Sequence, residues 1–340
     1  MSDKNKIMPD KIRAVQYGCG PIGLNVAALA LRRNGIELAG AVDIDPDLAG
    51  RDLGEAAGMD RAAGVIITND ADELLSRCRP DIVFHTTTSR LETAAAQISD
   101  LVRAGANVVS TCEELSFPYR RDPAVASKLD LLARQNSATV LGTGINPGFL
   151  MDAWPLFMTG PCQNVTHVKV ERMQDASGRR LPFQQKIGAG RTPEEFQALV
   201  ESGKLRHVGL PESIAMLAAG LGWKLDEITE SIEPVMAEKE VESPYLKVIP
   251  GQAAGVRQVG RGISQGAELI LMEFSAFIGA AESFDSVTIK GTPDISVRIH
   301  GGTHGDISTA AMVVNAASRV VAAAPGLITM KDLPPVTAGS

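Results

Sequence analysis

Two patterns of hydrophobic and polar positions alternate along the first 150 residues. Short runs rich in β-branched residues predict strands, whereas the Ala- and Leu-rich segments between them predict helices. The predicted strands are 11–17, 36–42, 65–68, 81–87, 106–111 and 138–141, and the predicted helices are 24–33, a segment from Asp70, 91–104 and 123–135. Such regular alternation predicts an α/β fold with a Rossmann-type, doubly wound parallel sheet.

The pattern changes in the second half of the chain. Long alternating runs follow one another there with few helices between them, which predicts an α+β domain with a mainly antiparallel sheet. The predicted strands are 165–174, 228–241, 255–265, 267–279 and 283–301. Thr192 and Pro193 have the residue types of a helix N-cap and first helical position. One face of this sheet is expected to be exposed and available for dimerisation.

A glycine-rich junction at 142–152 separates the two halves, with a helix expected from about Phe149. A broadly apolar helix at 307–324 is expected to return to the first domain. We therefore expect a dinucleotide-binding domain at 1–148, a substrate and dimerisation domain at 149–304, and a C-terminal helix and tail at 305–340. A chain of 340 residues is long enough for two domains.

The first predicted strand leads into Gly18-Cys19-Gly20-Pro21-Ile22-Gly23, and a helix follows. This is the G-x-G-x-x-G pattern of dinucleotide-binding folds. Gly18 permits the tight turn, Gly20 allows a pyrophosphate to approach the backbone, and Gly23 allows helix and strand to pack. The helix N-terminus favours the phosphate charge. The pattern and its context predict a site for NAD or NADP, with Pro21 and Ile22 among the candidate contacts.

Asp43 ends the second predicted strand, 20 residues after Gly23. A carboxylate there can accept hydrogen bonds from the hydroxyls of the adenosine ribose. Arg51 follows in a polar loop that is expected near the adenosine, where it could reach a 2′-phosphate. Because the carboxylate favours NAD and the guanidinium would favour NADP, the choice between the two cofactors stays open.

The fourth predicted strand enters a polar loop at 86–90, which should lie at the carboxyl edge of the sheet, where ligands bind in this fold. The hydroxyls of Thr86, Thr87 and Thr88 are candidate cofactor contacts. Capping of the next helix by Ser89 is an equal alternative. We interpret the preceding His85 as a packed strand residue rather than a base.

Two adjacent carboxylates, Glu113 and Glu114, follow the fifth predicted strand. Unpaired acids at such a position cost desolvation energy, so the pair predicts a carboxylate that points into the cleft beside the nicotinamide. Successive strand residues point to opposite faces, so both cannot do so if the strand continues through them. Glu113 is the first choice and Glu114 the second. The alternative is a solvated loop in which Glu114 caps a neighbouring element.

The junction and the start of the C-terminal helix supply candidates for the substrate pocket, because a two-domain dehydrogenase holds its substrate at such a junction. Aromatic residues make up only 4% of the chain, which strengthens the interpretation of two of them there as a pocket wall. The expected pocket residues are Ile145, Phe149, Trp154, Thr303 and His304. Asn146 is expected to contact the cofactor.

Composition and charge exclude several classes of protein. The chain is 44% hydrophobic and 21% charged, as in globular proteins. A net charge of −7 without a long basic cluster argues against nucleic acid or an anionic membrane as partner. No apolar run spans a bilayer and no signal-peptide core is evident, so a cytoplasmic location is expected. The four cysteines show no disulfide or metal-ligand spacing, so no metal is expected.

Together these motifs resemble the dihydrodipicolinate-reductase-like family, and more narrowly its branch of 2,4-diaminopentanoate dehydrogenases and native amine dehydrogenases. The resemblance rests on Gly18–Gly23, Asp43, Ser110-Thr111-Cys112-Glu113-Glu114-Leu115, Asn146-Pro147-Gly148-Phe149, and Gly305-Asp306 with Ala324-Pro325-Gly326-Leu327. The glycine pattern is unspecific, whereas the paired glutamates and the N-P-G-F junction are more specific. The H-H-x-x-x-x-x-K-x-D-x-P-S-G-T pattern of dihydrodipicolinate reductases themselves is absent, which argues against that activity.

The resemblance implies an NAD(P)-dependent homodimer that converts ketones or aldehydes and ammonia to amines, and the reverse, with a glutamate at the position of Glu113. The carbonyl compound and ammonia give a carbinolamine and then an iminium ion, which accepts hydride from nicotinamide C4. A carboxylate nearby would hold ammonium, take its proton and stabilise the cationic iminium. Burial between Phe149 and Trp154 would raise the pKa of that carboxyl toward the range of a general base.

Three other activities fit parts of the sequence. A diamino acid is a possible substrate, although no fixed cluster of cations is evident for its carboxylate; Arg172, Arg179 and Lys186 could be recruited. An alcohol dehydrogenase resembling homoserine dehydrogenases would use a lysine where this chain has acids. A non-catalytic NAD(P) sensor would bind cofactor and a protein partner. Ammonium dependence separates the amine from the alcohol reaction, and turnover excludes the sensor.

Overall fold

The computed structural model describes residues 11–339, and these form two units. The first unit comprises the described residues up to Phe149 and those from His304 onward, and the second spans Leu150–Thr303. The first unit contains a seven-stranded sheet; the second contains a six-stranded and a two-stranded sheet.

The sheet of the first unit is parallel throughout, in the order β15-β6-β5-β4-β1-β2-β3. Its strands are β1 (Ile12–Tyr17), β2 (Ile36–Val42), β3 (Ile67–Thr68), β4 (Ile82–His85), β5 (Asn107–Ser110), β6 (Thr139–Gly142) and β15 (Gly326–Ile328). The order of strand addition reverses at β1, which lies between β2 and β4. The predicted doubly wound sheet is therefore confirmed, with its switch point at the end of β1.

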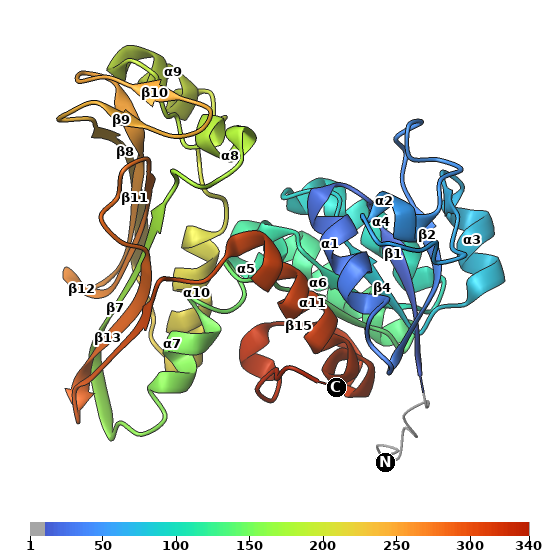
Figure 1. Ribbon diagram of the computed structural model, residues 1–340. Coiled ribbons are helices and arrows are strands. Elements are labelled where there is room, and N and C mark those ends of the chain that lie inside the picture. Colours follow the sequence, from blue (N-terminus) through green and yellow to red (C-terminus); the bar gives the residue numbers. More distant parts are fainter. Residues whose placement is uncertain (1–10, 340) are drawn as a thin grey trace. The chain divides into compact units, whose positions relative to one another are not determined.

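Helices pack on both faces of this sheet (Figure 1). They are α1 (Pro21–Ala30), α2 (Leu53–Ala56), α3 (Ala71–Cys78), α4 (Leu91–Arg103), α5 (Pro118–Arg121), α6 (Pro123–Gln135) and α11 (Gly305–Ala322), with 3-10 turns η1 (Glu113–Leu115) and η2 (Met330–Asp332). The long C-terminal helix α11 packs against α1 and against β5. Within residues 11–339, none of the helices combines the length and hydrophobicity needed to cross a membrane.

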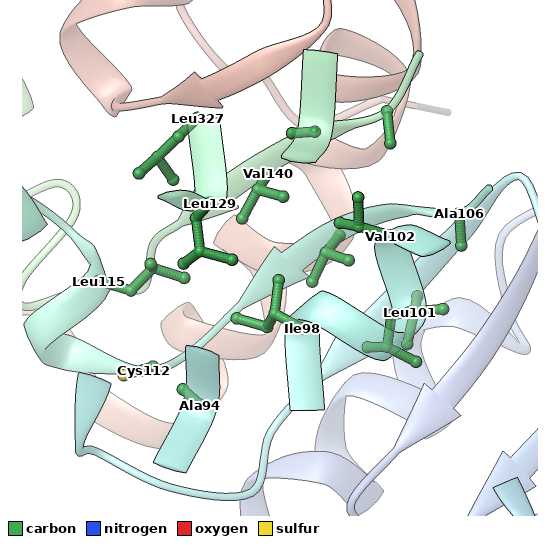
Figure 2. Packing of buried hydrophobic residues seen from close by; sticks show 14 of the residues in the cluster. Ala94, Ile98, Leu101, Val102, Ala106, Cys112, Leu115, Leu129, Val140 and Leu327 are labelled. Carbon is green, nitrogen blue, oxygen red and sulfur yellow. The ribbon is translucent and has the colours of Figure 1, made fainter. Parts of the chain in front are cut away.

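The core on the other face of the sheet extends to the turn after β5. Apolar side chains recur along α4 at helical spacing, so one face of that helix is buried, including Ala94, Ile98 and Leu101. These side chains pack with Leu129, Val140 and Leu327, and the same cluster includes Cys112 and Leu115 (Figure 2). Burial of each large aliphatic side chain contributes about 1.5–3 kcal/mol. The turn that carries Glu113 is therefore fixed to the core on both sides.

The second unit is built on a mixed sheet in the order β14-β13-β7-β12-β11-β8. Its strands are β7 (Asn164–Asp175), β8 (Glu227–Met236), β11 (Ala253–Ser264), β12 (Ala267–Phe277), β13 (Phe284–Thr292) and β14 (Ile295–His300). Only β7 and β12 pair in parallel; their other neighbours in the sheet are antiparallel. The predicted mainly antiparallel sheet is confirmed.

The helices of the second unit are α7 (Ala153–Met158), α8 (Leu181–Lys186), α9 (Pro193–Glu201) and α10 (Leu210–Leu221), and β9 (Val241–Glu242) pairs with β10 (Lys247–Val248). Helix α10 packs against β8, β11 and β12, and α7 packs against α10 (Figure 1). Thr192 and Pro193 begin α9 as predicted, with a capping box between Thr192 and Glu195.

Several predicted boundaries are wrong. The helix expected from about Phe149 begins at Ala153, because Asp152 is its N-cap and accepts a hydrogen bond from the Ala153 N–H. The single strand expected at 283–301 is a hairpin that turns at Pro293. The strand expected at 65–68 pairs with β2 only over Ile67–Thr68.

Candidate active site

The glycine turn after β1 has the geometry that a dinucleotide requires. Gly18 has a positive φ of 91°, and a Cβ added to Gly23 would lie 1.9 Å from the Gly18 carbonyl oxygen. Gly20, in contrast, faces open space, since an added Cβ would meet nothing within 4 Å. Helix α1 begins directly after Gly20, and no side chain caps it. A close-packed turn, an open glycine and an uncapped helix N-terminus fit the pyrophosphate of NAD or NADP.

Asp43 lies beside this turn, directly after β2. Its carboxylate accepts hydrogen bonds from the backbone N–H groups of Cys19 and Asp45. Burial and the nearby Asp43 charge raise the pKa of the Cys19 thiol to about 12, so this cysteine stays a neutral thiol. The side chain of Arg51 is exposed, while its backbone pairs with Leu48 and Ile67. Asp43 is thus fixed against the cofactor turn, whereas Arg51 is fixed only through its main chain.

A buried glutamine supports the glycine turn through side-chain hydrogen bonds. Gln16 on β1 is fully buried, and its Nε2 donates to the Gly18 carbonyl and to Thr86 Oγ1, both at 2.8 Å. The Thr86 hydroxyl in turn donates to the Gly18 carbonyl at 2.7 Å. Thr86 therefore braces the turn through its side chain. Gln16 was not among the predicted site residues, although a polar residue at an inward position of an apolar strand is a recognisable signal.

The other threonines of the loop after β4 have local partners. The Thr87 hydroxyl donates to Gln97 Oε1 at 2.6 Å, and Thr88 Oγ1 accepts from the Arg90 N–H at 3.2 Å. Helix α4 has no side-chain cap from its own N-cap residue, Arg90. Ser89 is therefore not the capping residue that one interpretation expected.

The two glutamates after β5 have different surroundings. The chain leaves the strand after Ser110 and enters η1, so the alternation of strand faces does not apply to them. The Glu114 carboxylate accepts from the Leu91 N–H at 2.8 Å and forms ion pairs with Arg90 and Arg121, both at 3.5 Å. Glu114 is 6% exposed and serves as the cap of α4. This contact is the one that the alternative interpretation described.

Glu113 is the one partly exposed side chain between Cys112 and Leu115. Cys112 and Leu115 are in the core, as Figure 2 shows, and Glu114 is tied to α4. The Ser116 hydroxyl and N–H both bind the Glu113 carbonyl oxygen, at 2.8 and 3.1 Å. The turn therefore places Glu113 after the carboxyl end of β5, with its backbone held by Ser116.

The junction after β6 begins in the first unit. The Ile145 N–H donates to Thr309 Oγ1 of α11 at 3.3 Å, and Ile145 is buried. Asn146, which precedes a cis proline, and Phe149 are partly exposed. Trp154 belongs to the second unit, in the first turn of α7, and is also partly exposed.

Thr303 and His304 also belong to different units. The Thr303 N–H donates to Asp285 Oδ2 at 2.8 Å, and its carbonyl accepts from Arg172 Nη2 at 2.8 Å. Arg172 and Asp285 form a buried ion pair at 2.7 Å. His304 is exposed, and its Nδ1 accepts from the Ile307 N–H at the start of α11. His304 thus has a capping contact.

The parallel register of the first unit places several candidates at one sheet edge. The carboxyl ends of β1, β2, β4, β5 and β6 carry the glycine turn, Asp43, Thr86–Thr88, Glu113 and Asn146, respectively. No group of three or more His, Cys, Asp or Glu side chains among residues 11–339 could hold a metal ion. The parallel sheet therefore brings the glycine turn, Asp43 and Glu113 to the edge at which ligands bind in doubly wound folds.

Known proteins share this sequence and fold. A family model described as the 2,4-diaminopentanoate dehydrogenase C-terminal domain matches residues 149–339. A 2,4-diaminopentanoate dehydrogenase from Acetoanaerobium sticklandii is 33% identical over 332 residues, covering 96% of this chain and 94% of that protein. An amine dehydrogenase from Streptomyces virginiae is 25% identical, covering 95% and 96% of the two chains. The solved structure of an amine dehydrogenase from Mycobacterium smegmatis has a TM-score of 0.83 at 26% identity, covering 97% of this chain and 98% of that one.

The fold, the glycine turn and these dehydrogenase relatives define an NAD(P)-dependent oxidoreductase, which confirms the predicted enzyme class. Within this class, the chain belongs to the 2,4-diaminopentanoate dehydrogenase family, and the predicted resemblance is confirmed.

Proposed function

We propose that the protein is an amine dehydrogenase that converts a ketone or aldehyde and ammonia to an amine, and catalyses the reverse deamination. The observation that carries this proposal is the Glu113 carboxylate, which is partly exposed at the carboxyl end of β5 while its neighbours are buried. Two relatives support it, because the names 2,4-diaminopentanoate dehydrogenase and amine dehydrogenase denote enzymes that act on compounds with amino groups.

The glycine turn, Asp43 and the start of α1 are proposed to hold the cofactor, with Thr86, Thr87, Thr88 and Asn146 as further contacts. Bound there, NAD(P)H supplies the hydride that reduces the carbon–nitrogen double bond, and NAD(P)+ accepts it in the reverse direction. The turn offers its backbone N–H groups to the phosphates, and Asp43 offers carboxylate oxygens to the ribose hydroxyls.

Glu113 is proposed to act on the nitrogen. Its negative charge attracts ammonium, and its carboxylate accepts a proton as ammonium becomes the nucleophile that attacks the carbonyl carbon. The protonated carboxyl then returns this proton to the carbinolamine hydroxyl, which leaves as water, and the regenerated carboxylate stabilises the cationic iminium. Ketone, ammonium and NAD(P)H thereby give amine, water and NAD(P)+, with atoms and charge balanced. Electrostatic stabilisation of this kind contributes about 3–4 kcal/mol, or a factor of about 10²–10³ in rate.

A diamino acid is the second candidate substrate, and one observation favours it. Burial, together with the positive charges of Lys186 and Arg172, lowers the pKa of His207 to about 3. Lys186 and Arg172 therefore act electrostatically on the same buried histidine of the second unit, and Arg179 acts on Arg172. Arg172 is held in its buried ion pair with Asp285, and Arg179, which lies over the Phe183 ring, and Lys186 are proposed as the carboxylate contacts.

The apolar part of the substrate is proposed to contact Ile145, Phe149 and Trp154, with Thr303 and His304 as polar contacts. The side chains of Ile145, Phe149, Trp154 and Thr303 carry no charge that would select an acidic substrate. We expect small ketones and aldehydes to be accepted for this reason.

A homodimer is proposed through the sheet of the second unit. An added Cβ on Gly260 would meet Ile214 of α10, so the neighbouring Val259 points to the opposite face. That face carries Val259 and the Arg257–Glu273 ion pair, and no described helix of this unit covers it (Figure 1). Light scattering is expected to give twice the chain mass of 35.9 kDa, and a monomer mass would contradict the dimer.

The experiment that tests the function follows NADH and NADPH absorbance with cyclohexanone, other small ketones, aldehydes and, in reverse, 2,4-diaminopentanoate. We expect oxidation of the reduced cofactor only when ammonium is present. Oxidation without ammonium would replace the proposal with an alcohol dehydrogenase, and cofactor binding without any turnover would favour a sensor. The cofactor with the higher kcat/KM shows whether the enzyme prefers NAD or NADP, which the presence of both Asp43 and Arg51 does not decide.

A further inference from the structure

His85 lies at the end of β4, and its side chain is completely buried. Its ring Nδ1 is 2.9 Å from Ser110 Oγ, and its Nε2 is 2.8 Å from Gln97 Oε1 and 3.0 Å from Thr87 Oγ1. The Tyr17 ring stacks on it, with centroids 5.7 Å apart. The prediction of His85 as a packed strand residue agrees with this burial, and the structure adds a hydrogen-bond partner for each ring nitrogen.

The protonation state of this ring is fixed by its surroundings. Burial lowers the pKa of His85 to about 4, so the ring is neutral at neutral pH and carries one proton. The Gln97 oxygen, which also accepts from the Thr87 hydroxyl, accepts that proton from Nε2. Nδ1 is therefore an acceptor, and the Ser110 hydroxyl donates to it.

The chain of hydrogen bonds continues to the backbone of the turn that carries Glu113. Ser110 Oγ accepts from the Cys112 N–H at 3.1 Å, and Cys112 is the residue that precedes η1. The donors therefore all point one way, from Cys112 through Ser110 and His85 to Gln97, and hydrogen bonds in such a chain polarise and strengthen one another. The Thr111 N–H adds a bond of 2.9 Å to the His85 carbonyl.

We propose that His85 is a positioning residue for Glu113, acting through the Ser110 hydroxyl on the Cys112 N–H. The side chains of Cys112 and Leu115 anchor the turn to the core, and the Leu115 N–H holds the Cys112 carbonyl at 3.1 Å. The Ser110 hydroxyl holds the preceding Thr111–Cys112 peptide through the Cys112 N–H, and this peptide sets where the chain enters the turn. The proposal rests on the proposed function, since it assumes that Glu113 acts in catalysis. A displacement of about 1 Å of a catalytic group can cost about 10²-fold in rate, so a small rotation of this turn is expected to be visible in kcat.

Two substitutions of His85 test the hydrogen bond between the Ser110 hydroxyl and Nδ1 of the ring. In His85→Asn the side-chain amide takes the place of Nδ1 and can still accept from Ser110, but the contact to Gln97 is lost. In His85→Gln the amide takes the place of Nε2 and keeps Gln97, but Ser110 loses its acceptor. Both remove the ring and its stacking on Tyr17, so the variants are nearly matched in packing.

We expect His85→Gln to lower kcat about 10- to 100-fold, whereas His85→Asn retains kcat within about threefold of the wild-type protein. The KM for ketone and the NAD(P)H dissociation constant, measured by cofactor fluorescence, should change little in either variant. Equal losses in the two variants, or losses confined to KM, cofactor affinity or the melting temperature, would overturn the proposal and leave His85 a packing residue.

Ser110→Ala provides a second route that leaves the ring in place. It should lower kcat as much as His85→Gln, and the double variant should show no further loss, because both changes break the same link. Additive losses would contradict the shared link. If Glu113→Gln is inactive while the Ser110 and His85 variants have wild-type kcat, only this inference fails; if Glu113→Gln is fully active, the proposed function fails instead.

Discussion

Four backbone N–H groups surround the carboxylate of Asp52. Oδ1 accepts from Gly54, Glu55 and Ala63, and Oδ2 accepts from Gly64 at 2.7 Å. These bonds favour the charged form, so the pKa of Asp52 lies below its usual value, with the Ala63 bond as the largest cause. The side chain thus ties α2 to the loop that precedes β3.

Asp52→Asn should therefore destabilise the protein in a pH-dependent way. An amide offers one acceptor oxygen and turns an NH2 group toward N–H donors, at a cost of about 1–3 kcal/mol at pH 7. A lowered folded-state pKa means that the charged group stabilises the fold above the ordinary aspartate pKa and loses this effect as the pH falls through the lowered value. Melting curves by circular dichroism should show a difference at pH 7 that shrinks toward pH 3. A constant difference would contradict this account.

Residue-level prediction succeeded where local chemistry decides and failed where long-range contacts decide. A helix was predicted from Asp70, and in the structure Asp70 is the N-cap of α3 and accepts from the Glu73 N–H. The choice between Glu113 and Glu114 could not be made in the same way. Glu114 caps a helix that starts 23 residues earlier in the sequence, and the turn into η1 ends the strand alternation on which the argument relied.

At the scale of elements, the alternation of hydrophobic and polar positions was sufficient for most strands and for the sheet class. It could not show where β15 lies. This strand covers only Gly326–Ile328, and it pairs with β6 through a contact that spans nearly 190 residues of sequence. The start of α7 was misplaced because the Asp152 cap, whose other oxygen accepts from Ser213 on α10, overrides local preference.

The turn between β1 and α1 offers a matched pair of glycine substitutions. Gly23→Ala forces a Cβ to within 1.9 Å of the Gly18 carbonyl oxygen, a backbone atom, so the turn must open. Gly20→Ala meets nothing within 4 Å in the protein itself. Gly23→Ala should lower both the melting temperature and cofactor affinity, the latter at least about 10-fold.

Gly20→Ala, in contrast, should leave the melting temperature unchanged while it weakens cofactor binding, because the methyl group takes the space that a pyrophosphate needs. Fluorescence titration with NADH and NADPH, beside melting curves, measures both quantities. Unchanged cofactor affinity in Gly20→Ala would show that the phosphates do not pass this glycine.

At the scale of the whole molecule, the chain leaves the first unit after Phe149 and returns to it at His304. At the return point each residue is held within its own unit. Thr303 bonds to Asp285 and Arg172 of the second unit, and His304 accepts from the Ile307 N–H of the first. The predicted boundary near residue 149 rested on glycine content. The buried Arg172–Asp285 pair could not be foreseen, because its partners are far apart in sequence and occupy neighbouring strands only in the folded sheet.

The central claim is that Glu113, rather than Glu114, performs the chemistry. Its most direct test compares kcat of Glu113→Gln and Glu114→Gln at saturating ketone, ammonium and reduced cofactor. We predict that Glu113→Gln lowers kcat about 10²-fold or more with cofactor affinity unchanged, whereas Glu114→Gln keeps kcat within a few-fold and lowers the melting temperature, because it loses its pairs with Arg90 and Arg121. Near-normal kcat in Glu113→Gln, or loss of kcat in a stably folded Glu114→Gln, would contradict the account.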